Sequence, residues 1–570
     1  MDSAELRQKF LDFFEEKGHK IVPSSSLVTS DQTVLFTTAG MQQFKPYYFS
    51  EKSPYGDNVA TSQKCLRVSD IEEVGDEGHL TFFEMLGNFS FGGYFKKEAI
   101  KLAKEFLDEL NIKIDYVTVF EGDKNTPRDE ESAKAWGELG FSEEKGNLRY
   151  ENKQENFWGP TGEEGPCGPT TEIYSGGTSD SLSTSIEIWN IVFNQYYCLK
   201  DKKLEPLKTP GIDTGMGLER ILAVINSAEN IFHTDLFEKS HQKLHELLKK
   251  ENPISERIIL DHLKAATFIL AEHIEPSNIE RGYILRRLIR RAIRHGRQIG
   301  IERKFCSKIA QAVIDTMGDV YPEIINNKDF IFDQLNKEEE KFEKTLENGL
   351  REFEKLSNVS GKDAFNLYQT YGFPIEITEE LAKEKGIKVD VKEFKKELGK
   401  HQELSRTASA GMFKGGLADT LEQTTKLHTA AHLMLAGLRK VLGDHVVQKG
   451  SNITAERLRF DFTYKEKMSS GQIGDVENFV NGIIEKDLPV SCEEMTLEKA
   501  KELDAMGVFE SKYGQTVKVY TVGDGDNVVS REICGGPHVD RTGILGHFKI
   551  TKEESSSSGV RRIRAILSPQ

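Results

Sequence analysis

The sequence predicts an α+β protein of several domains, with an antiparallel sheet in the first part, helices in the middle, and mixed α and β at the end. The chain has 570 residues, whereas one domain usually holds about 100–200. Before residue 235, β-type runs such as Val34–Thr37 and Ile186–Phe193 alternate with glycine-rich turns. Helical periodicity then dominates, as in Asp333–Lys355. These observations favour segregated sheet and helix regions over alternating βα units.

We expect four segments along the chain. Residues 1–235 form the first α+β domain, and residues 236–404 form a helical domain. Residues 405–417 are rich in small side chains and glycine, which is typical of a linker. Residues 418–570 form a last domain of mixed α and β.

Composition excludes several classes of protein. Hydrophobic residues make up 37% of the chain and charged residues 29%, which is typical of a soluble globular protein. No apolar run approaches the roughly 18 residues that cross a bilayer, and the acidic start is unlike a secretory signal. Six cysteines without framework spacing suit a reducing compartment, so we expect a cytoplasmic protein without membrane contact. A net charge of −16 argues against general nucleic-acid binding, but a local arginine cluster at residues 281–297 permits phosphate contact.

Three segments carry the chemistry of a nucleotide site: residues 19–45, 63–97 and 211–220. In the second, Arg67 ends a β-type run, an acidic loop follows from Asp70 to Gly78, and Thr81–Met85 forms another run. This pattern predicts a hairpin with an arginine on the ascending strand. Attack of a carboxylate on a phosphate builds negative charge, which fixed guanidinium groups stabilise. Arg67 and Arg220 are therefore candidate phosphate-binding and catalytic residues.

Other nucleotide motifs are missing from the sequence. There is no Walker loop and no GxGxxG segment after a strand. Residues 467–470, KMSS, resemble the ATP loop of class I synthetases, but no partner HIGH segment is present. We interpret this tetrapeptide as a chance match.

The three segments resemble the signature motifs of class II aminoacyl-tRNA synthetases, and in detail those of the alanyl-tRNA synthetases. The resemblance implies a catalytic domain built on the class II antiparallel sheet, with ATP and Mg²⁺ bound. It implies that Arg67 contacts the α-phosphate and Arg220 the γ-phosphate, that Phe83 or Phe89 stacks on adenine, and that Glu187 binds Mg²⁺.

Residues 156–173 and 187–195 extend the resemblance to the amino-acid pocket. By carry-over, Trp158 and Val192 enclose the methyl group of L-alanine, Asp213 pairs with its ammonium group, and Asn190 lies near its carboxylate or the nucleotide. A buried carboxylate suits an ammonium group, and apolar walls suit a methyl group. Taken singly, Trp158 is more typical of a core and Asp213 of a turn or cap, so these assignments depend on the motif.

Residues 280–297 predict an amphipathic helix with an apolar stripe and an arginine flank. The spacing of guanidinium groups along one helix face matches the spacing of phosphates in an A-form RNA stem, which favours RNA binding. The alternative is that this face forms salt bridges with the acidic helices downstream. The resemblance favours contact with tRNA(Ala) through six arginines: Arg281, Arg286, Arg287, Arg290, Arg291 and Arg294.

In the alanyl-tRNA synthetases, two polar residues read a G·U pair of the acceptor stem. The matching positions hold Glu280 and Glu376, where Asn and Asp are expected. Asn278 is an alternative reader beside Glu280.

A third group of residues predicts a metal site in the last domain. His428 and His432 lie four residues apart on an apolar-periodic stretch, so both imidazoles share one helix face. Cys534 and His538 flank a Gly-Gly turn, so the four residues suffice for a tetrahedral Zn²⁺ site or for a three-ligand site with an open position. Thr429 stands where a metalloprotease has glutamate, which argues against peptidase chemistry.

The order HxxxH then CxxxH resembles the editing domain shared by alanyl- and threonyl-tRNA synthetases, which hydrolyses mischarged tRNA. In this resemblance Gln448 is a substrate contact and Pro537 replaces the usual Thr. A pocket for alanine excludes glycine or serine by only about 1–3 kcal/mol, so a second hydrolytic site is needed.

The resemblance covers roughly residues 1–565 and implies an alanine-activating, tRNA-charging and editing enzyme. Relatives carry a β-barrel subdomain before the editing core and a C-terminal extension, and neither has a counterpart in this sequence. We therefore expect either a naturally minimal enzyme or a shortened chain, which is a monomer or at most a weak dimer. Three alternatives remain: an editing hydrolase with a degenerate synthetase half, a non-catalytic tRNA-binding paralogue, and activation of another small amino acid.

Overall fold

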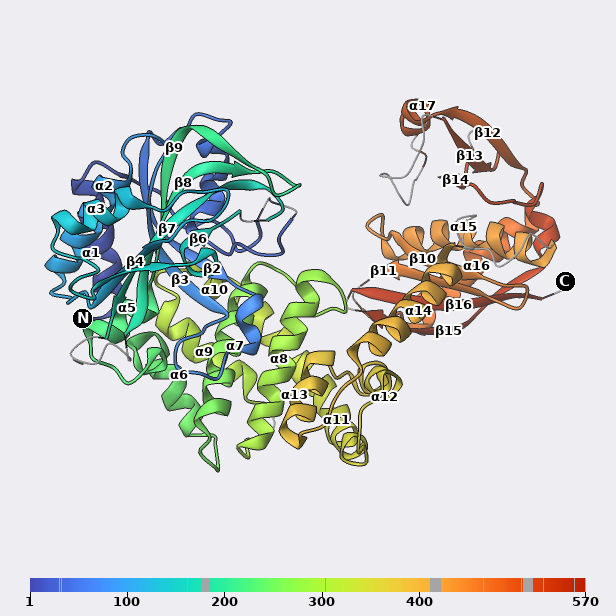
Figure 1. Cartoon of the computed structure of the whole chain (residues 1–570). Helices are drawn as coiled ribbons and strands as arrows, with labels where there is room; N and C mark the ends of the chain where they lie inside the picture. The colour runs from blue at the N-terminus through green and yellow to red at the C-terminus, as the bar shows by residue number, and fades with distance from the viewer. Residues whose placement is uncertain are drawn as a thin grey trace. The chain divides into compact units, whose positions relative to one another are not determined.

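The computed structural model describes residues 1–568 except 30, 32, 161, 177–184, 303, 411–421, 465, 504, 506–515, 526 and 558. The chain divides into two compact units, Met1–Asp390 and Val391–Gln570 (Figure 1). The first unit contains the predicted sheet domain and most of the predicted helical domain. Within the described residues, no helix is both long and apolar enough to span a bilayer.

The first unit is built around a largely antiparallel sheet. Its strand order is β1-β2-β3-β9-β8-β7-β4-β5, with β6 paired to β7 and with parallel pairing only for β1–β2 and β4–β5. This confirms the predicted fold class. The strands are β1 (Lys20–Ile21), β2 (Asn58–Leu66), β3 (Phe82–Ser90), β4 (Tyr116–Phe120), β5 (Leu148–Glu151), β6 (Phe157–Trp158), β7 (Gly165–Ser175), β8 (Ile186–Cys198) and β9 (Leu204–Gly217).

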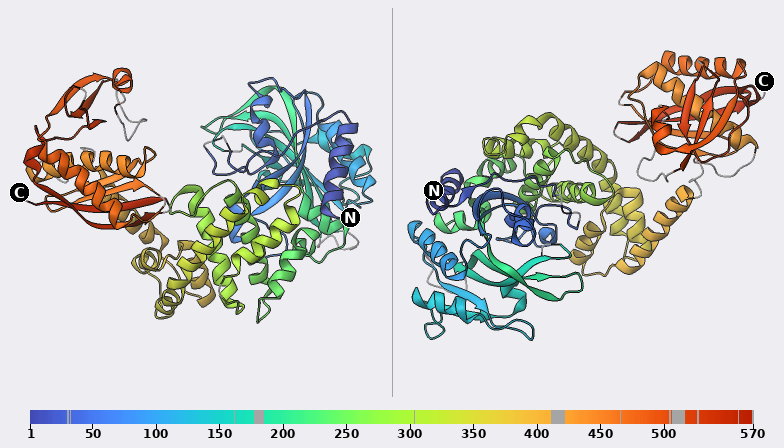
Figure 2. Two further views of the ribbon diagram at one scale, coloured as in Figure 1. Left: turned by 180° about the vertical axis from the view of Figure 1, so that it is seen from behind. Right: turned by 90° about the horizontal axis from the view of Figure 1, so that it is seen from above.

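Helices cover one face of this sheet, as the views in Figures 1 and 2 show. Phe10 and Phe14 of α1 and Phe106 of α2 pack their rings around Trp189 of β8. Because side chains alternate along a strand, the neighbours of Trp189 on β8 face the opposite side. The helices and short turns of this region are α1 (Ser3–Glu16), α2 (Lys96–Glu109), α3 (Glu130–Glu138), α4 (Lys153–Asn156), α5 (Leu218–Ile225), η1 (Gly40–Tyr48), η2 (Ser69–Glu72) and η3 (Ile231–His233).

The predicted hairpin around Arg67 is confirmed. Strands β2 and β3 pair antiparallel, with Leu66 opposite Phe82, so Arg67 follows directly on β2. The prediction of a strand at Val34–Thr37 is wrong, because this run forms no strand and instead leads into the 3-10 helix η1. By contrast, Ile186–Phe193 lies inside β8 as predicted.

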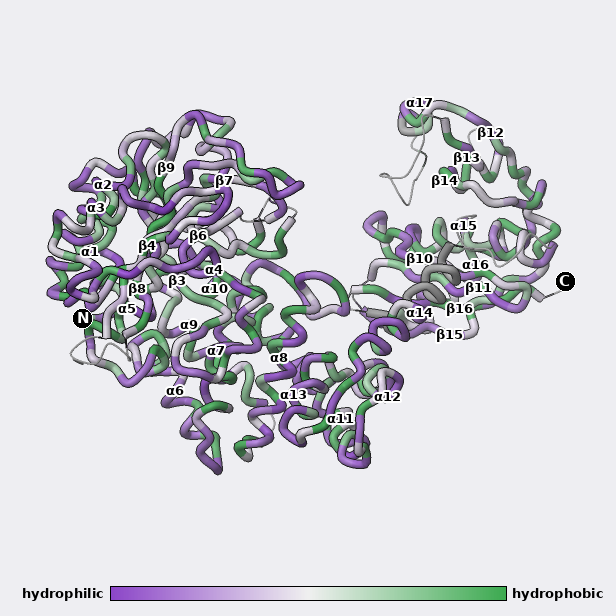
Figure 3. Tube along the Cα trace, in the orientation of Figure 1, coloured by the Kyte–Doolittle hydropathy of each residue, from purple (hydrophilic) through white to green (hydrophobic). Residues whose placement is uncertain are grey.

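Helices dominate the rest of the first unit, as predicted, and the tube in Figure 3 alternates between hydrophobic and hydrophilic residues along them. The central helix α8 packs on α7 and α11 through Leu285, Leu288 and Ile289, which are fully buried. The elements are α6 (Asp235–His245), α7 (Pro253–Ala271), α8 (Glu280–Gln298), α9 (Cys306–Met317), α10 (Pro322–Asn326), α11 (Lys328–Glu354), α12 (Gly361–Asn366), η4 (Leu367–Tyr371) and α13 (Ile375–Lys385).

The second unit holds two small antiparallel sheets, of order β10-β11-β16-β15 and β12-β13-β14. Helices α15 and α16 pack on the first sheet, whose alternating residues Leu458, Phe460 and Phe462 are buried beneath them. The elements are α14 (Val391–Ala410), α15 (Glu422–Leu442), α16 (Ser470–Glu485), α17 (Leu497–Glu502), η6 (Thr542–Leu545), β10 (Gln448–Ile453), β11 (Leu458–Thr463), β12 (Val490–Thr496), β13 (Thr516–Val522), β14 (Ser530–Ile533), β15 (His547–Ser557) and β16 (Val560–Ser568).

The predicted linker and the KMSS tetrapeptide both lie in the second unit. The predicted linker 405–417 begins inside α14, which continues to Ala410, and the remainder lies outside the described residues. The KMSS tetrapeptide has a local structural role, because Ser469 caps α16 in a capping box with Gln472.

Candidate functional site

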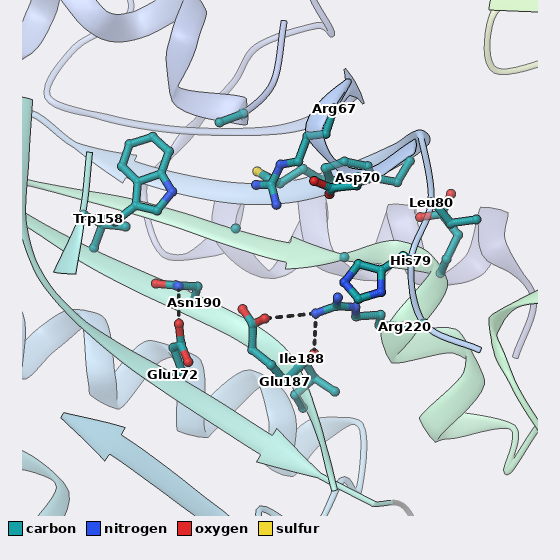
Figure 4. Close-up of a pocket in the computed structure, with 18 of the residues that line it drawn as sticks. Arg67, Asp70, His79, Leu80, Trp158, Glu172, Glu187, Ile188, Asn190 and Arg220 are labelled. Atoms are coloured by element: carbon teal, nitrogen blue, oxygen red, sulfur yellow. Dashed lines mark hydrogen bonds and ion pairs between the residues drawn. The ribbon is translucent and has the colours of Figure 1, made fainter. Parts of the chain in front are cut away.

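A cavity of about 310 Å³ opens on the face of the large sheet opposite α1 and α2. Eight residues singled out from the sequence line it together, although they come from five separate segments. Figure 4 labels five of them, namely Arg67, Trp158, Glu187, Asn190 and Arg220. Arg67 and Phe83 belong to the β2–β3 hairpin, Trp158 to β6, Asn190 and Val192 to β8, Asp213 to β9 and Arg220 to α5. Glu187 of β8 lines the same cavity.

Asp213 is the one ionisable residue among the four predicted contacts of the amino acid. It is only 4% exposed. Burial raises the pKa of Asp213 to about 7, while the nearby Arg67 guanidinium opposes the rise. A buried carboxylate of this kind favours a cationic partner, because an ammonium group replaces the hydration that burial removed. Trp158 and Val192 line the same cavity and supply apolar surface.

Arg67 is held where the hairpin turns. Its Nε donates to the carbonyl oxygen of Thr38 at 3.2 Å, and its guanidinium lies over the ring of Phe83 at 5.1 Å. Phe83 therefore lines the cavity beside Arg67. The alternative assignment of adenine stacking to Phe89 is wrong, because Phe89 is fully buried against Phe44 in the core.

Glu187 and Arg220 form an ion pair at the rim of the cavity. Arg220 Nη1 donates to Glu187 Oε2 at 2.9 Å and to the Glu187 carbonyl oxygen at 3.2 Å. Both side chains are about a third exposed. They are therefore accessible to a polyphosphate and its metal ion, and the pair keeps the arginine fork oriented toward the cavity.

Sequence reasoning missed Glu172, which lines the cavity on β7 next to Asn190. Glu172 Oε1 accepts a hydrogen bond from Asn190 Nδ2 at 2.8 Å. Burial and the nearby Glu187 carboxylate raise the pKa of Glu172 to about 8. His79 and Asp70, in the loop between β2 and β3, also line the cavity. Only the pairing of β7 with β8 brings Glu172 to Asn190, so spacing in the sequence held no signal for it.

The arginine helix departs from expectation. Four of its arginines, expected on an exposed face, are at most 6% exposed: Arg287, Arg290, Arg291 and Arg294. They pair with acidic residues of neighbouring elements: Glu72, Glu338, Glu376, Glu380 and Glu384. The prediction of an exposed, RNA-facing row is therefore wrong for these four arginines. Their guanidinium groups are buried and already paired, so contact with RNA phosphates would require breaking those ion pairs.

One acidic partner in this network, Glu380, is strongly stabilised as an anion. Although burial opposes it, a hydrogen bond from His295 and the charges of Arg291 and Arg294 hold the pKa of Glu380 well below its usual range. The network thus fastens α8 to α11 and α13. It is the pairing with downstream acidic helices that the sequence left as the alternative.

Polar groups remain accessible near the start of α8. Asn278 and Glu280 are exposed, Arg281 and Arg286 are partly exposed, and Glu280 has a left-handed backbone with φ 49°. Arg286 bonds to Asn278, and Arg281 Nε donates to the carbonyl oxygen of Leu35 at 2.5 Å. Glu376 is half-buried and accepts a hydrogen bond from the Tyr283 hydroxyl at 2.7 Å. The tRNA-contacting candidates thus split into an accessible group and a buried one.

The four predicted metal ligands of the second unit come together. The ligand atoms of His428 and His432 on α15, and of Cys534 and His538 in the loop after β14, all lie within 4.8 Å of one another. Cys534 Sγ is 3.5 Å from His428 Nε2. Nε2 of His538 is buried without a hydrogen-bond partner. Three imidazoles and a thiolate match the donors that Zn²⁺ prefers.

Outer contacts hold each imidazole by its other nitrogen. His428 Nδ1 lies 3.0 Å from the Pro537 carbonyl oxygen, and His432 Nδ1 lies 2.6 Å from Glu532 Oε2. His538 Nδ1 lies 3.2 Å from the Thr429 hydroxyl. Such contacts fix the ring orientation and direct the Nε2 atoms to a common point. The replacement of Thr by Pro537 leaves a backbone acceptor in place, so the departure from the family pattern does not disturb the ligands.

The electrostatics of the cluster also suit a cation. Although burial opposes it, the surrounding histidines, first of all His428, which contacts the sulfur, lower the pKa of the Cys534 thiol to about 2. The thiolate and the Glu532 carboxylate, despite burial, raise the pKa of His432 to about 10. The predicted substrate contact Gln448 begins β10 and donates from Nε2 to Ser451 Oγ at 3.1 Å.

Comparisons with known proteins agree with both sites. Residues 5–476 match the family model of class II tRNA synthetases (A), and residues 517–564 match the second additional domain of threonyl and alanyl tRNA synthetases. The chain is 49% identical to the alanine–tRNA ligase of Treponema denticola and 47% identical to that of Treponema pallidum, each over 99% of this chain and 98% of the relative. It is 40% identical to the alanine–tRNA ligase of Thermotoga petrophila, over 99% of this chain and 80% of the relative.

Proposed function

This chain belongs to the class II alanine–tRNA ligase family, and we propose that it joins alanine to tRNA(Ala) with consumption of ATP and clears its own errors. It is an enzyme, a ligase, whose substrates are alanine, ATP and tRNA(Ala). The observation that carries the proposal is the cavity where the buried Asp213 carboxylate, apolar Trp158 and Val192, and the two arginines Arg67 and Arg220 meet.

We assign the cavity residues to adenylate formation. Asp213 binds the ammonium group of alanine, while Trp158 and Val192 enclose its methyl group. The alanine carboxylate oxygen attacks the α-phosphorus of ATP, a new C–O–P bond forms, and pyrophosphate leaves. Arg67 stabilises charge on the α-phosphate and Arg220 charge on the γ-phosphate, because guanidinium groups stay ionised and bind phosphate in a fork.

Other residues of the cavity support this step. Phe83 offers its ring to adenine beside Arg67. Glu172 orients Asn190, whose side chain lies near the substrate carboxylate. Mg²⁺ held by Glu187 would neutralise phosphate charge when bound. Glu187 and Arg220 already form a pair at the rim, so phosphates reaching Arg220 arrive next to the carboxylate proposed for the metal.

We assign hydrolysis of mischarged Ser-tRNA(Ala) and Gly-tRNA(Ala) to the second unit. His428, His432, Cys534 and His538 would hold Zn²⁺, which when bound supplies a Lewis acid for the ester or a water molecule. Gln448 is the proposed contact for the aminoacyl group. A separate site is needed because a pocket for one methyl group discriminates glycine or serine by only about 1–3 kcal/mol.

We place tRNA recognition near the start of α8. Asn278, Glu376, Arg281 and Arg286 are accessible or half-buried polar groups there, and they are proposed to contact the acceptor stem. The buried arginines of α8 are proposed to support this surface by fixing the helix. We further propose that the enzyme is a cytoplasmic monomer. Light scattering that detects a stable tetramer would contradict the monomer.

The test is alanine-dependent ATP–pyrophosphate exchange, with glycine and serine as comparison amino acids. Strong exchange with alanine and weaker exchange with the other two supports adenylation in the cavity. Absence of exchange from a protein that still deacylates Ser-tRNA(Ala) would identify an editing hydrolase instead. Binding of tRNA with neither activity would identify a non-catalytic paralogue.

A further inference from the structure

A second group of metal-binding side chains lies in the first unit, away from the cavity residues. It consists of His241 and His245 on α6 and Glu256 on α7, and their ligand atoms lie within 4.8 Å of one another. Among the residues that the structure describes, this group and the His428 cluster are the two that bring three or more such ligands together. No step proposed for aminoacylation or editing uses it.

The two histidines present the same edge to one carboxylate oxygen. His241 and His245 are one helical turn apart, and their rings stack at 4.4 Å between centroids. Glu256 Oε2 lies 2.9 Å from His245 Nε2 and 4.0 Å from His241 Nε2. Adjacent ligand atoms of a tetrahedral site at metal distances of about 2.0–2.2 Å are separated by roughly 3.3–3.6 Å, which lies between these two distances.

Glu256 is positioned for a ligand rather than placed by chance on the surface. It is only 6% exposed, and its other oxygen, Oε1, accepts a hydrogen bond from the Asn252 backbone N–H at 2.9 Å. A buried carboxylate oxygen directed at two imidazoles favours a cation between them.

We infer that His241, His245 and Glu256 form a Zn²⁺ site with three protein ligands and an open fourth position. Two histidines and one glutamate are an established ligand set for this metal. The ion would tie the C-terminal end of α6 to the first turn of α7 and so close the connection at residues 246–252. The ring of His233 lies 5.7 Å from that of His241.

Cobalt substitution of the full-length, untagged protein tests this inference. The protein is stripped with a chelator and titrated with Co²⁺, whose visible absorption reports tetrahedral binding. The Cys534 cluster gives a thiolate-to-cobalt charge-transfer band, whereas the His241 site has no sulfur ligand and gives none. We expect about two equivalents of Co²⁺ per chain, one of them without the thiolate band.

The variant His245→Gln separates the outcomes, and His547→Gln is the matched control, because both histidines are exposed. We expect His245→Gln to lose the equivalent of Co²⁺ that gives no thiolate band. The variant should also lose the rise in Tm that Zn²⁺ gives the wild type. Its thiolate band and its far-UV circular dichroism should not change. His547→Gln keeps both equivalents. The inference would be overturned if the wild type bound one equivalent of Co²⁺, the one with the thiolate band, and His245→Gln bound the same amount. His241 and His245 would then be only a histidine pair hydrogen-bonded to Glu256.

Discussion

Arg290 Nε donates to Glu338 Oε1 at 2.6 Å, and both side chains are at most 6% exposed. The bond joins α8 to α11 inside the helical region. A second guanidinium nitrogen of Arg290 bonds to the carbonyl oxygen of Gly372, so one arginine also ties η4 to this core. A residue that the sequence assigns to RNA is thus part of the folded interior.

We predict that Arg290→Ala lowers the free energy of unfolding of the first unit by up to about 3–5 kcal/mol, because the buried Glu338 carboxylate keeps only Arg286, 3.2 Å away, as its cationic partner. Chemical denaturation followed by circular dichroism measures this effect. The control Arg351→Ala removes an exposed arginine paired with Glu347 at 3.8 Å and should cost at most about 0.5 kcal/mol. Equal stability of Arg290→Ala and wild type would refute the buried pair.

Arg281 should behave in the opposite way. We predict that Arg281→Ala weakens binding of tRNA(Ala) and reduces the slope of log affinity against log salt by about 1, as loss of one phosphate contact requires. Alanine-dependent pyrophosphate exchange should not change, because Arg281 does not line the cavity. Filter binding at several salt concentrations checks the slope. An unchanged slope would exclude a phosphate contact at this position.

The raised pKa of Asp213 predicts a pH dependence for alanine. The ammonium group needs the carboxylate form, and with a pKa of about 7 only about a tenth of the free enzyme has it near pH 6. The KM for alanine should therefore be about tenfold higher at pH 6 than above pH 8, while the KM for ATP serves as the internal control. Pyrophosphate exchange across this range measures both constants.

Two further results bear on the same residue. Asp213→Asn should abolish this pH dependence and raise the KM for alanine at high pH. Because the folded-state pKa exceeds the unfolded value of 3.8, the contribution of Asp213 to stability is present at low pH and is lost as pH rises through about 7. A flat KM profile in the wild type would show that another group binds the ammonium.

Glu532 should matter for metal affinity without being a ligand. Its contact of 2.6 Å with His432 Nδ1 orients the imidazole, and loss of such an outer contact typically weakens metal binding about 10–100-fold. We predict this loss for Glu532→Gln in a competition titration between the protein and a zinc chelator. Glu498→Gln, at an exposed position of α17, is the control and should leave affinity unchanged. Equal affinities for both variants would argue against Glu532 as a positioning residue.

Local patterns in the sequence were enough to predict the fold class, the Arg67 hairpin and the four-ligand cluster. Spacing carries this information, because period-2 alternation marks strands and an i, i+4 pair of histidines shares one helix face. The motifs also identify Asp213, Trp158 and Val192 as pocket residues through their resemblance to the family.

The tertiary structure decides which polar groups are buried and which residues they contact. Helical periodicity distinguishes an apolar stripe from a charged flank, but it does not show whether acidic helices cover that flank, as they cover Arg290 and Arg294. Likewise, Phe83 and Phe89 lie six residues apart on β3 and share one face of the sheet, but Phe44 of η1 packs over Phe89 and buries it while Phe83 lines the cavity. Glu172 and Asn190 are brought together by strand pairing. Such contacts join residues distant in the chain, so they follow from packing and not from spacing.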